Sequence, residues 1–195
     1  MPLSLLPLLC LILSGCGLLR PQVVDIDRAA LSDGLGFRTD GRGQLAQLGY
    51  HVTPSETPVA VRAAMDRLHP GNPYTDAQVE TRGPRLLYKL TRIVDGLEIA
   101  SIFQSDGTLV SEELEIPEDQ VPASVRETIA ERISNAALPR YDEVRDGLGE
   151  VRAYHVRLRL KTHRYKLVLS REGTMLQALL EIPAAVEVPV APPTS

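Results

Sequence analysis

The chain has 195 residues, which is enough for one ordinary domain or two small ones. Hydrophobic residues make up 44% of it, so the chain can build a packed core and extensive disorder is excluded. Aromatic residues make up only 4%, Trp is absent and the formal net charge is −4, so we expect no nucleic-acid partner.

The N-terminal segment combines an apolar run with a cysteine. Residues 3–13 are almost wholly apolar, which is too short for a bilayer span and typical of the apolar region of a signal peptide. They lead into Leu13-Ser14-Gly15-Cys16, which resembles the lipobox of bacterial lipoproteins. The resemblance implies that residues 1–15 are a lipoprotein signal peptide and that acyl chains on Cys16 anchor the protein to a membrane. An ordinary secretory signal with a chance cysteine is the alternative.

The same segment bears on location and on disulfides. Gly17 follows the cysteine, and in enterobacterial lipoproteins a residue other than Asp at this position favours the outer membrane. We therefore expect a lipid-anchored protein of the bacterial cell envelope, on the periplasmic face of the outer membrane. Cys10 and Cys16 are the two cysteines of the chain, so no disulfide is expected in its folded part.

Residues 16–56 are expected to be the lipidated N-terminus and a flexible linker, because no period of two or 3.6 residues is sustained there. Within this range, residues 33–43 are rich in Gly and Asp, which favours a surface loop. A calcium loop is the alternative, but the acidic residues do not have the EF-hand spacing.

A long sequence pattern then occurs twice. Residues 103–117 contain Asp-Gly-Thr-Leu followed by a strand pattern and Ile-Pro, and residues 169–183 contain Glu-Gly-Thr-Met followed by the same ending. Gly107 and Gly173 differ by 66 positions, and so do Tyr88 and Tyr154. The chain is therefore a tandem duplication.

Each repeat is expected to open with a helix that has one apolar face. The first helix is predicted from Thr57 to Leu68 with Met65 in the core, and the second from Ser124 to Ala137, where Leu138-Pro139 would end it. Three strands follow each helix, and short segments at 77–81 and 143–145 could add an edge strand to each sheet. The predicted strands are 86–94, 97–104 and 108–116 in the first repeat, and 154–161, 165–169 and 175–182 in the second.

These elements predict an α+β fold of two tandem repeats, each a helix packed on a three- to four-stranded antiparallel sheet. The first repeat is placed at residues 57–117 and the second at 118–183. Residues 184–195 are expected to be a disordered, proline-rich tail.

The order of helix, strand with a Tyr-x-aliphatic pattern, Asp-Gly-Thr-Leu turn and acidic final strand resembles the PepSY-like domains of bacterial envelope proteins. The tandem arrangement also resembles the β-lactamase-inhibitor-protein fold. The resemblance covers roughly residues 57–183. It implies a non-enzymatic binding or inhibitory module at the cell envelope.

No residue pattern indicates catalysis, a metal site or a cofactor. The four histidines, His51, His69, His155 and His163, form no zinc-binding pair on a helix, and His155 and His163 are expected on a solvated strand face. There is no nucleophile elbow and no phosphate-binding glycine motif. We therefore expect that the protein is not an enzyme.

Charge is divided between the repeats. Residues 93–125 contain eight acidic residues and no Lys or Arg, whereas residues 151–171 contain seven basic residues and no acid. Three interpretations remain open: the basic face is merely solvated, the two repeats attract each other, or the basic face recruits an acidic partner, which is a protein or the phosphates of envelope lipids.

The third interpretation yields a site hypothesis, namely an envelope protein partner with an acidic surface. Its contacts are predicted on the polar face of the basic strands, at Arg157, Arg159, Lys161, Arg164 and Lys166. A structural or assembly lipoprotein of the outer membrane is the alternative function.

Overall fold

The computed structural model describes residues 35–133 and 137–182. In this part of the chain ten strands form one antiparallel sheet, in which each strand pairs with the next one along the chain. The strands are β1 (Leu35–Thr39), β2 (Leu45–His51), β3 (Tyr74–Arg82), β4 (Arg85–Val94), β5 (Leu97–Phe103), β6 (Leu109–Ile116), β7 (Ala137–Asp146), β8 (Val151–Leu160), β9 (His163–Leu169) and β10 (Met175–Glu181).

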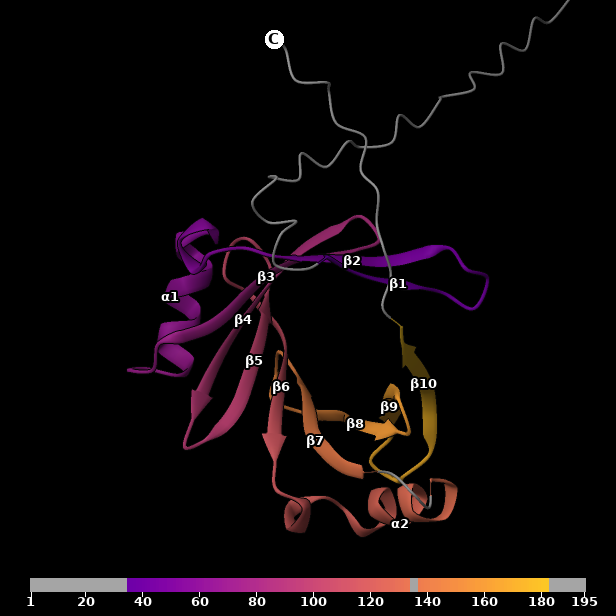
Figure 1. The fold of residues 1–195 in the computed structure, drawn as a ribbon. Coiled ribbons are helices and arrows are strands. Elements are labelled where there is room, and N and C mark those ends of the chain that lie inside the picture. The colour runs from indigo at the N-terminus through magenta and orange to yellow at the C-terminus, as the bar shows by residue number, and fades with distance from the viewer. Residues whose placement is uncertain (1–34, 134–136, 183–195) are drawn as a thin grey trace, which may run out of the picture.

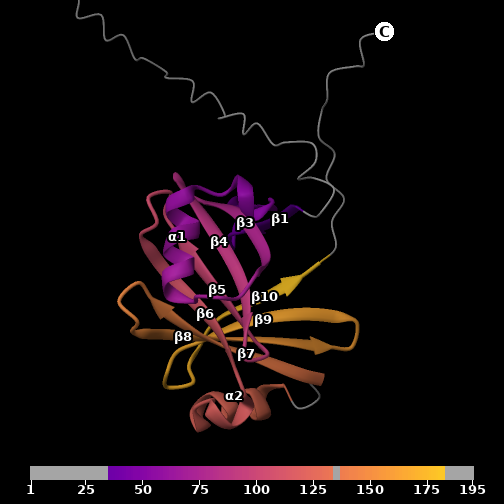
Figure 2. The same cartoon turned by 90° about the vertical axis from the view of Figure 1, so that its left-hand side faces the viewer.

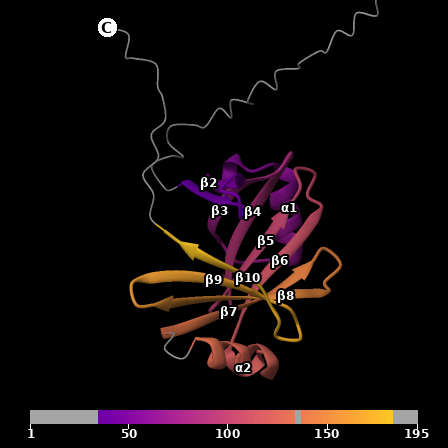
Figure 3. The same cartoon turned by 90° about the vertical axis from the view of Figure 1, so that its right-hand side faces the viewer.

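The sheet curls into a half-barrel, and two short helices lie outside the curl (Figure 1). Helix α1 (Val59–Leu68) lies against the β3–β5 part and α2 (Ala123–Arg132) against the β7–β10 part. Each follows a short 3₁₀ helix, η1 (Pro54–Glu56) or η2 (Glu118–Gln120). Figures 2 and 3 show that β7–β9 run across the direction of β3–β5, so the strand direction turns strongly along the sheet.

The expected fold class of two separate helix-on-sheet repeats is wrong, because the sheet is continuous. Strand β6 pairs with β7 over six residues, from Ser111 opposite Asp146 to Ile116 opposite Tyr141. The segments expected as short edge strands are β3 and β7, which have nine and ten residues and pair on both sides. Pairing β6 with β7 leaves no open edge between the two halves, and an open edge is a liability for aggregation.

The second helix is shorter than its apolar periodicity indicated. It ends at Arg132, and Ile133 has the non-helical angles φ −137° and ψ 66°. Ala137, expected at the end of that helix, is the first residue of β7. Strand β7 accommodates Pro139 because its register with β8 shifts between Ala137 and Arg140, so the missing N–H falls at an irregularity of the ladder.

The linker prediction is also wrong for residues 35–51, which form the β1–β2 hairpin. The Gly- and Asp-rich loop is the turn of this hairpin. Asp40 Oδ1 accepts hydrogen bonds from the N–H groups of Arg42 at 2.8 Å and Gln44 at 2.9 Å, and Gly43 adopts φ +77°. The predicted signal peptide, Cys16 and the tail at 184–195 lie outside the described residues.

Two clusters of buried side chains hold the helices to the sheet. Under α1 the buried residues are Val61, Ala64, Met65, Ala77, Leu90 and Phe103, which confirms the core position of Met65. Under α2 they are Val121, Val125, Ile129, Tyr141, Tyr154, Val156, Leu158, Leu167 and Leu169. The apolar positions of the strands alternate because only one face of the sheet packs on a helix.

The duplicated glycines mark equivalent contacts between a hairpin turn and a helix. Gly107 and Gly173 have φ +85° and +83°, values at which side chains are disfavoured. A Cβ atom at 107 would lie 2.6 Å from the carbonyl oxygen of Ala60, and one at 173 would lie 2.4 Å from that of Ser124. The repeat in the sequence therefore reflects close approach of each turn to the first turn of its helix.

Candidate functional site

The concave face of the sheet encloses a hollow of about 910 Å³ that is bordered by strands from β1 to β10. Its walls carry charged and polar side chains, in contrast to the apolar positions on the helix side of the same strands. This separation of polar from apolar side chains follows from strand geometry, since alternate side chains point to opposite faces. The basic face expected to be open to solvent is therefore the inner face of the half-barrel.

Glu113 of β6 lies at the centre of this face, with a side chain only 9% exposed. Its carboxylate is 3.1 Å from Arg157 Nη2, 3.5 Å from Lys166 Nζ and 3.8 Å from Lys89 Nζ. His155 Nδ1 lies 3.4 Å away and is 13% exposed, so the expectation that His155 is solvated is wrong. We call these five residues the Glu113 cluster.

The Glu113 cluster depends on the curl of the sheet. Strands β4 and β9 are five positions apart, which corresponds to about 24 Å in a flat sheet. Side chains stand roughly perpendicular to a sheet, so Lys89 and Lys166 reach the same carboxylate only because the strands bend toward each other. The ion pairs consequently stabilise the curled shape.

The cluster also changes the ionisation of its members. Burial alone would raise the pKa of Glu113, but His155, Lys89 and Lys166 outweigh it and hold that pKa well below its usual range. Burial lowers the pKa of Lys166, and the nearby positive charges of Arg157 and Lys89 lower it further, although Glu113 acts in the opposite direction. Glu113 is thus a firmly ionised centre among basic groups.

A second set of ion pairs crosses from the acidic strands to β7. Arg140 donates to Glu98 Oε1 at 2.8 Å and to Asp142 Oδ1 at 2.9 Å. Asp142 is completely buried, and its other oxygen lies 3.0 Å from Arg157 Nη1. The hydrogen bond from Arg140 lowers the pKa of Glu98, against the effect of burial.

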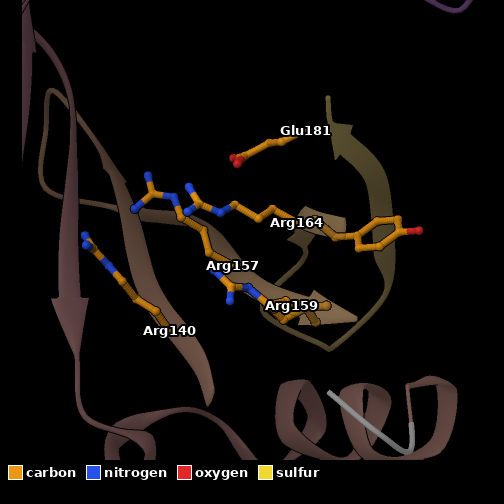
Figure 4. A pocket seen from close by; sticks show the side chains of 7 residues that line it. Arg140, Arg157, Arg159, Arg164 and Glu181 are labelled. Carbon is orange, nitrogen blue, oxygen red and sulfur yellow. The ribbon is translucent and has the colours of Figure 1, made fainter. Parts of the chain in front are cut away.

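Next to these pairs is a smaller hollow of about 540 Å³, which we call the arginine pocket (Figure 4). It is lined by Arg140, Arg157, Leu158, Arg159, Arg164, Tyr165 and Glu181. Arg159 and Arg164 face each other across β8 and β9 and are exposed. Within the described part of the chain, neither has an acidic oxygen within 4.0 Å.

The five predicted contact residues therefore fall into different settings. Arg157 and Lys166 are held by Glu113, whereas Arg159 and Arg164 are open to the arginine pocket. Lys161 is exposed in the turn between β8 and β9, with φ +55°. Whether any of them binds a partner stays a prediction.

Sequence reasoning missed the acidic and basic residues that come from other strands: Lys89, Glu98, Glu113, Arg140 and Asp142. The opposite charge of the two repeats was the signal that could have found them. The observed pairs of Glu98 with Arg140 and of Glu113 with Arg157 agree with the interpretation that the repeats attract each other.

One further polar cluster was not expected, on the α1 side of the sheet. His69 Nε2 lies 2.8 Å from Glu112 Oε1, and the Ser101 hydroxyl donates to the same oxygen at 2.8 Å. Ser101 is completely buried and contacts the carboxylate rather than the imidazole, so the three residues are not arranged as a nucleophile and its base.

Residues 35–133 and 137–182 contain no group of three or more His, Cys, Asp or Glu side chains placed to hold a metal ion. Neither helix in these ranges is long and apolar enough to cross a membrane.

No protein-family model matches the chain, and no curated protein matches it. Several solved structures are similar. A crystal structure described as “putative periplasmic proteins” from Bacteroides eggerthii DSM 20697 aligns with 16% identity and a TM-score of 0.51, over 64% of this chain and 88% of that one. A DUF2874 family protein from Bacteroides uniformis ATCC 8492 aligns with 16% identity and a TM-score of 0.50, over 64% and 89%.

A BLIP-like protein from Bacteroides fragilis NCTC 9343 aligns with 16% identity and a TM-score of 0.46, over 68% of this chain and 92% of that one. The PepSY-like resemblance stays a prediction. At 16% identity, the similarity to the B. eggerthii and B. uniformis proteins concerns the fold, which this chain shares with them.

Proposed function

We propose that this protein is a non-enzymatic periplasmic module that binds a segment of another protein on the concave face of its sheet. The main observation in support is the hollow of about 910 Å³, whose lining includes charged side chains from β1 to β10. A volume of this size lies within the range typical of ligand sites. Periplasmic location is supported by the fold shared with the B. eggerthii protein and by the lipobox ending at Cys16.

A binding role fits the chemistry of this face better than catalysis does. The buried carboxylates of Glu113 and Asp142 both contact Arg157, so they do not present a free base or nucleophile to the hollow. Binding by exposed cations needs no such group. Lipid attachment at Cys16, on the periplasmic face of the outer membrane, would hold the module near envelope partners.

Of the five predicted contact residues, Arg159, Lys161 and Arg164 are available for a partner, because Arg157 and Lys166 already contact Glu113. An envelope protein with an acidic surface is the complementary partner. Reversing the charge of Arg157 or Lys166 would disturb the Glu113 cluster as well as binding. A variant that tests binding alone therefore keeps Arg157 and Lys166.

The test is a cross-linked pull-down from native envelopes with the wild type and with the double variant Arg159→Glu/Arg164→Glu. The matched control is Arg126→Glu/Arg132→Glu, which reverses two exposed arginines of α2 outside the curl. Circular dichroism and urea unfolding establish that all three proteins fold. We expect one specific protein to be lost from the first variant and retained by the control.

An unchanged set of captured proteins in the first variant would contradict binding through the arginines of the concave face. Salt separates the remaining possibilities, since exposed charge contacts are screened over about 8 Å at physiological ionic strength. A captured protein that persists at high salt and with reversed charges would indicate an apolar assembly interface instead.

A further inference from the structure

Two pairs of arginines face each other directly across neighbouring strands of the concave face. Arg140 of β7 is opposite Arg157 of β8, and Arg159 of β8 is opposite Arg164 of β9. Like charges directly opposite each other in a sheet are destabilising. Both pairs line the arginine pocket, so the same unfavourable arrangement occurs twice in one place.

The first pair is compensated within the protein. Arg140 bonds Glu98 and Asp142, and Arg157 contacts Glu113 and Asp142 at 3.1 and 3.0 Å. This pair shows what arginines of this face require, namely carboxylate oxygens within bonding distance. It therefore serves as an internal reference for the second pair.

The second pair has no such compensation among the described residues. Arg159 and Arg164 are exposed, and no acidic side chain described there approaches either of them within 4.0 Å. Figure 4 shows both side chains extending into the space that Arg157 also borders. A guanidinium presents a planar set of N–H donors that matches the two oxygens of a carboxylate.

Glu181 is the acidic residue that lines the arginine pocket. It is opposite Arg164 in the pairing of β9 with β10, and Figure 4 shows its carboxylate pointing toward the arginines. It comes from the outermost strand of the sheet and makes no ion pair within 4.0 Å among the described residues. Its negative charge is near enough to act on an incoming anion without satisfying the arginines.

We propose that Arg159 and Arg164 form a docking site for a carboxylate side chain of an acidic protein segment, and that Glu181 is an internal competitor for this site. The inference rests on the proposed function, for which it names the chemical group recognised. A carboxylate between the two guanidinium groups offsets their mutual repulsion. Glu181 opposes its entry by like-charge repulsion, so partners with only weakly acidic segments are rejected.

The test measures binding of a hexaglutamate peptide to the purified full chain by isothermal titration calorimetry, with hexalysine as the peptide control. Arg159→Gln/Arg164→Gln is expected to weaken binding by about tenfold, because two charge-assisted contacts are lost. Arg126→Gln/Arg132→Gln on α2 is the matched control and leaves affinity unchanged. Binding of hexaglutamate is expected to weaken as salt concentration rises.

Two further variants test the specific parts of the proposal. Glu181→Gln removes the competing charge and is expected to strengthen binding several-fold, whereas Glu172→Gln in the exposed β9–β10 turn has no effect. Arg159→Lys/Arg164→Lys keeps both charges but loses the planar donor sets, and an intermediate affinity is expected.

Equal affinity of the wild type and Arg159→Gln/Arg164→Gln would overturn the docking site, and unchanged affinity in Glu181→Gln would overturn the competitor. These results are independent of the pull-down. If the chain captures a protein through its concave face but does not bind hexaglutamate, this inference fails and the proposed function stands. If it binds hexaglutamate at the arginines but captures no protein, the proposed function fails instead.

Discussion

The two halves of the sheet each pack on one helix, but the strands that meet between them differ in charge on the concave face. Strands β5 and β6 supply Glu98 and Glu113, whereas β7, β8 and β9 supply Arg140, Arg157 and Lys166. On the helix side the halves are alike. Val61 and Met65 of α1 are fully buried, Val125 of α2 is fully buried, and Ile129 of α2 is nearly so. The packing against the helices is thus alike in the two halves, and the difference lies in the charges of the opposite face.

This difference shows how much of the basic character is used within the molecule. The charge of β8 and β9, taken alone, resembles a surface for an acidic partner, but Arg157 and Lys166 are neutralised by the other half. Only the arginines farther along these strands, Arg159 and Arg164, remain open. The contrast between the satisfied and open cations can be tested by the following changes, in order of decreasing effect.

The largest effect is expected for Glu113→Gln, which keeps the size of the side chain and removes its charge. Breaking a buried ion pair typically costs about 3–5 kcal/mol, because the partner charges are left without compensation. The free energy of unfolding, measured in urea, should fall by that amount, whereas Glu150→Gln in the exposed β7–β8 turn should change it by less than about 0.5 kcal/mol. Equal stability of the two variants would refute the structural role of the Glu113 cluster.

The next effect concerns the contact between a glycine turn and a helix, which each half has within itself. Gly107→Ala and Gly173→Ala should each lower the free energy of unfolding by about 2–4 kcal/mol, because a Cβ atom overlaps a helix carbonyl at a left-handed backbone position. Gly96→Ala has the same backbone strain at φ +83° but no neighbour within 4 Å, so about 1–2 kcal/mol is expected. A similar loss at all three positions would show that strain alone, and not contact with the helix, explains the repeated glycines.

Acid should weaken the connection between the halves. Glu98 and Glu113 have folded-state pKa values below those of the unfolded chain, so they stabilise the fold above about pH 4.3 and lose this contribution as pH falls through their folded values. The loss should therefore begin only below about pH 4.3, because both folded-state pKa values are lowered. The midpoints of urea unfolding at pH 7, 5 and 3.5 measure this loss of stability.

The double variant Glu98→Gln/Glu113→Gln is the control for the pH series. Its stability should depend less on pH over the same range, because the two titrating groups are absent. If the wild type and the double variant lose stability in parallel, other carboxyl groups cause the acid dependence.

The smallest effect distinguishes the two arginine pairs. Arg159→Gln should leave stability unchanged or raise it by up to about 1 kcal/mol, because it relieves repulsion from Arg164. Arg140→Gln should lower it by about 1–3 kcal/mol, because it removes hydrogen bonds from Glu98 and from the buried Asp142. Thermal unfolding of both variants under one condition compares them, and a loss in Arg159→Gln would mean that this arginine is also part of the structural network.

Local pattern determined several features that the structure bears out. The core position of Met65 and the strands flanking Gly107 could be predicted because periodicity and turn residues act over a few neighbouring positions. The β1–β2 hairpin could not, since Gly36 and Gly49 interrupt the alternation of its strands. Likewise, the apolar spacing of Ile133 and Ala137 mimicked a longer helix.

Sequence alone therefore determined two helices, each followed by antiparallel strands, and the separation of acidic residues at 93–125 from basic residues at 151–171. Only the tertiary structure decided that all the strands form one sheet and that Glu113 meets cations from β4, β8 and β9. The physical reason is distance along the chain. Which strand edges meet, and how far a sheet curls, depend on contacts between residues dozens of positions apart, and these leave no period in the sequence.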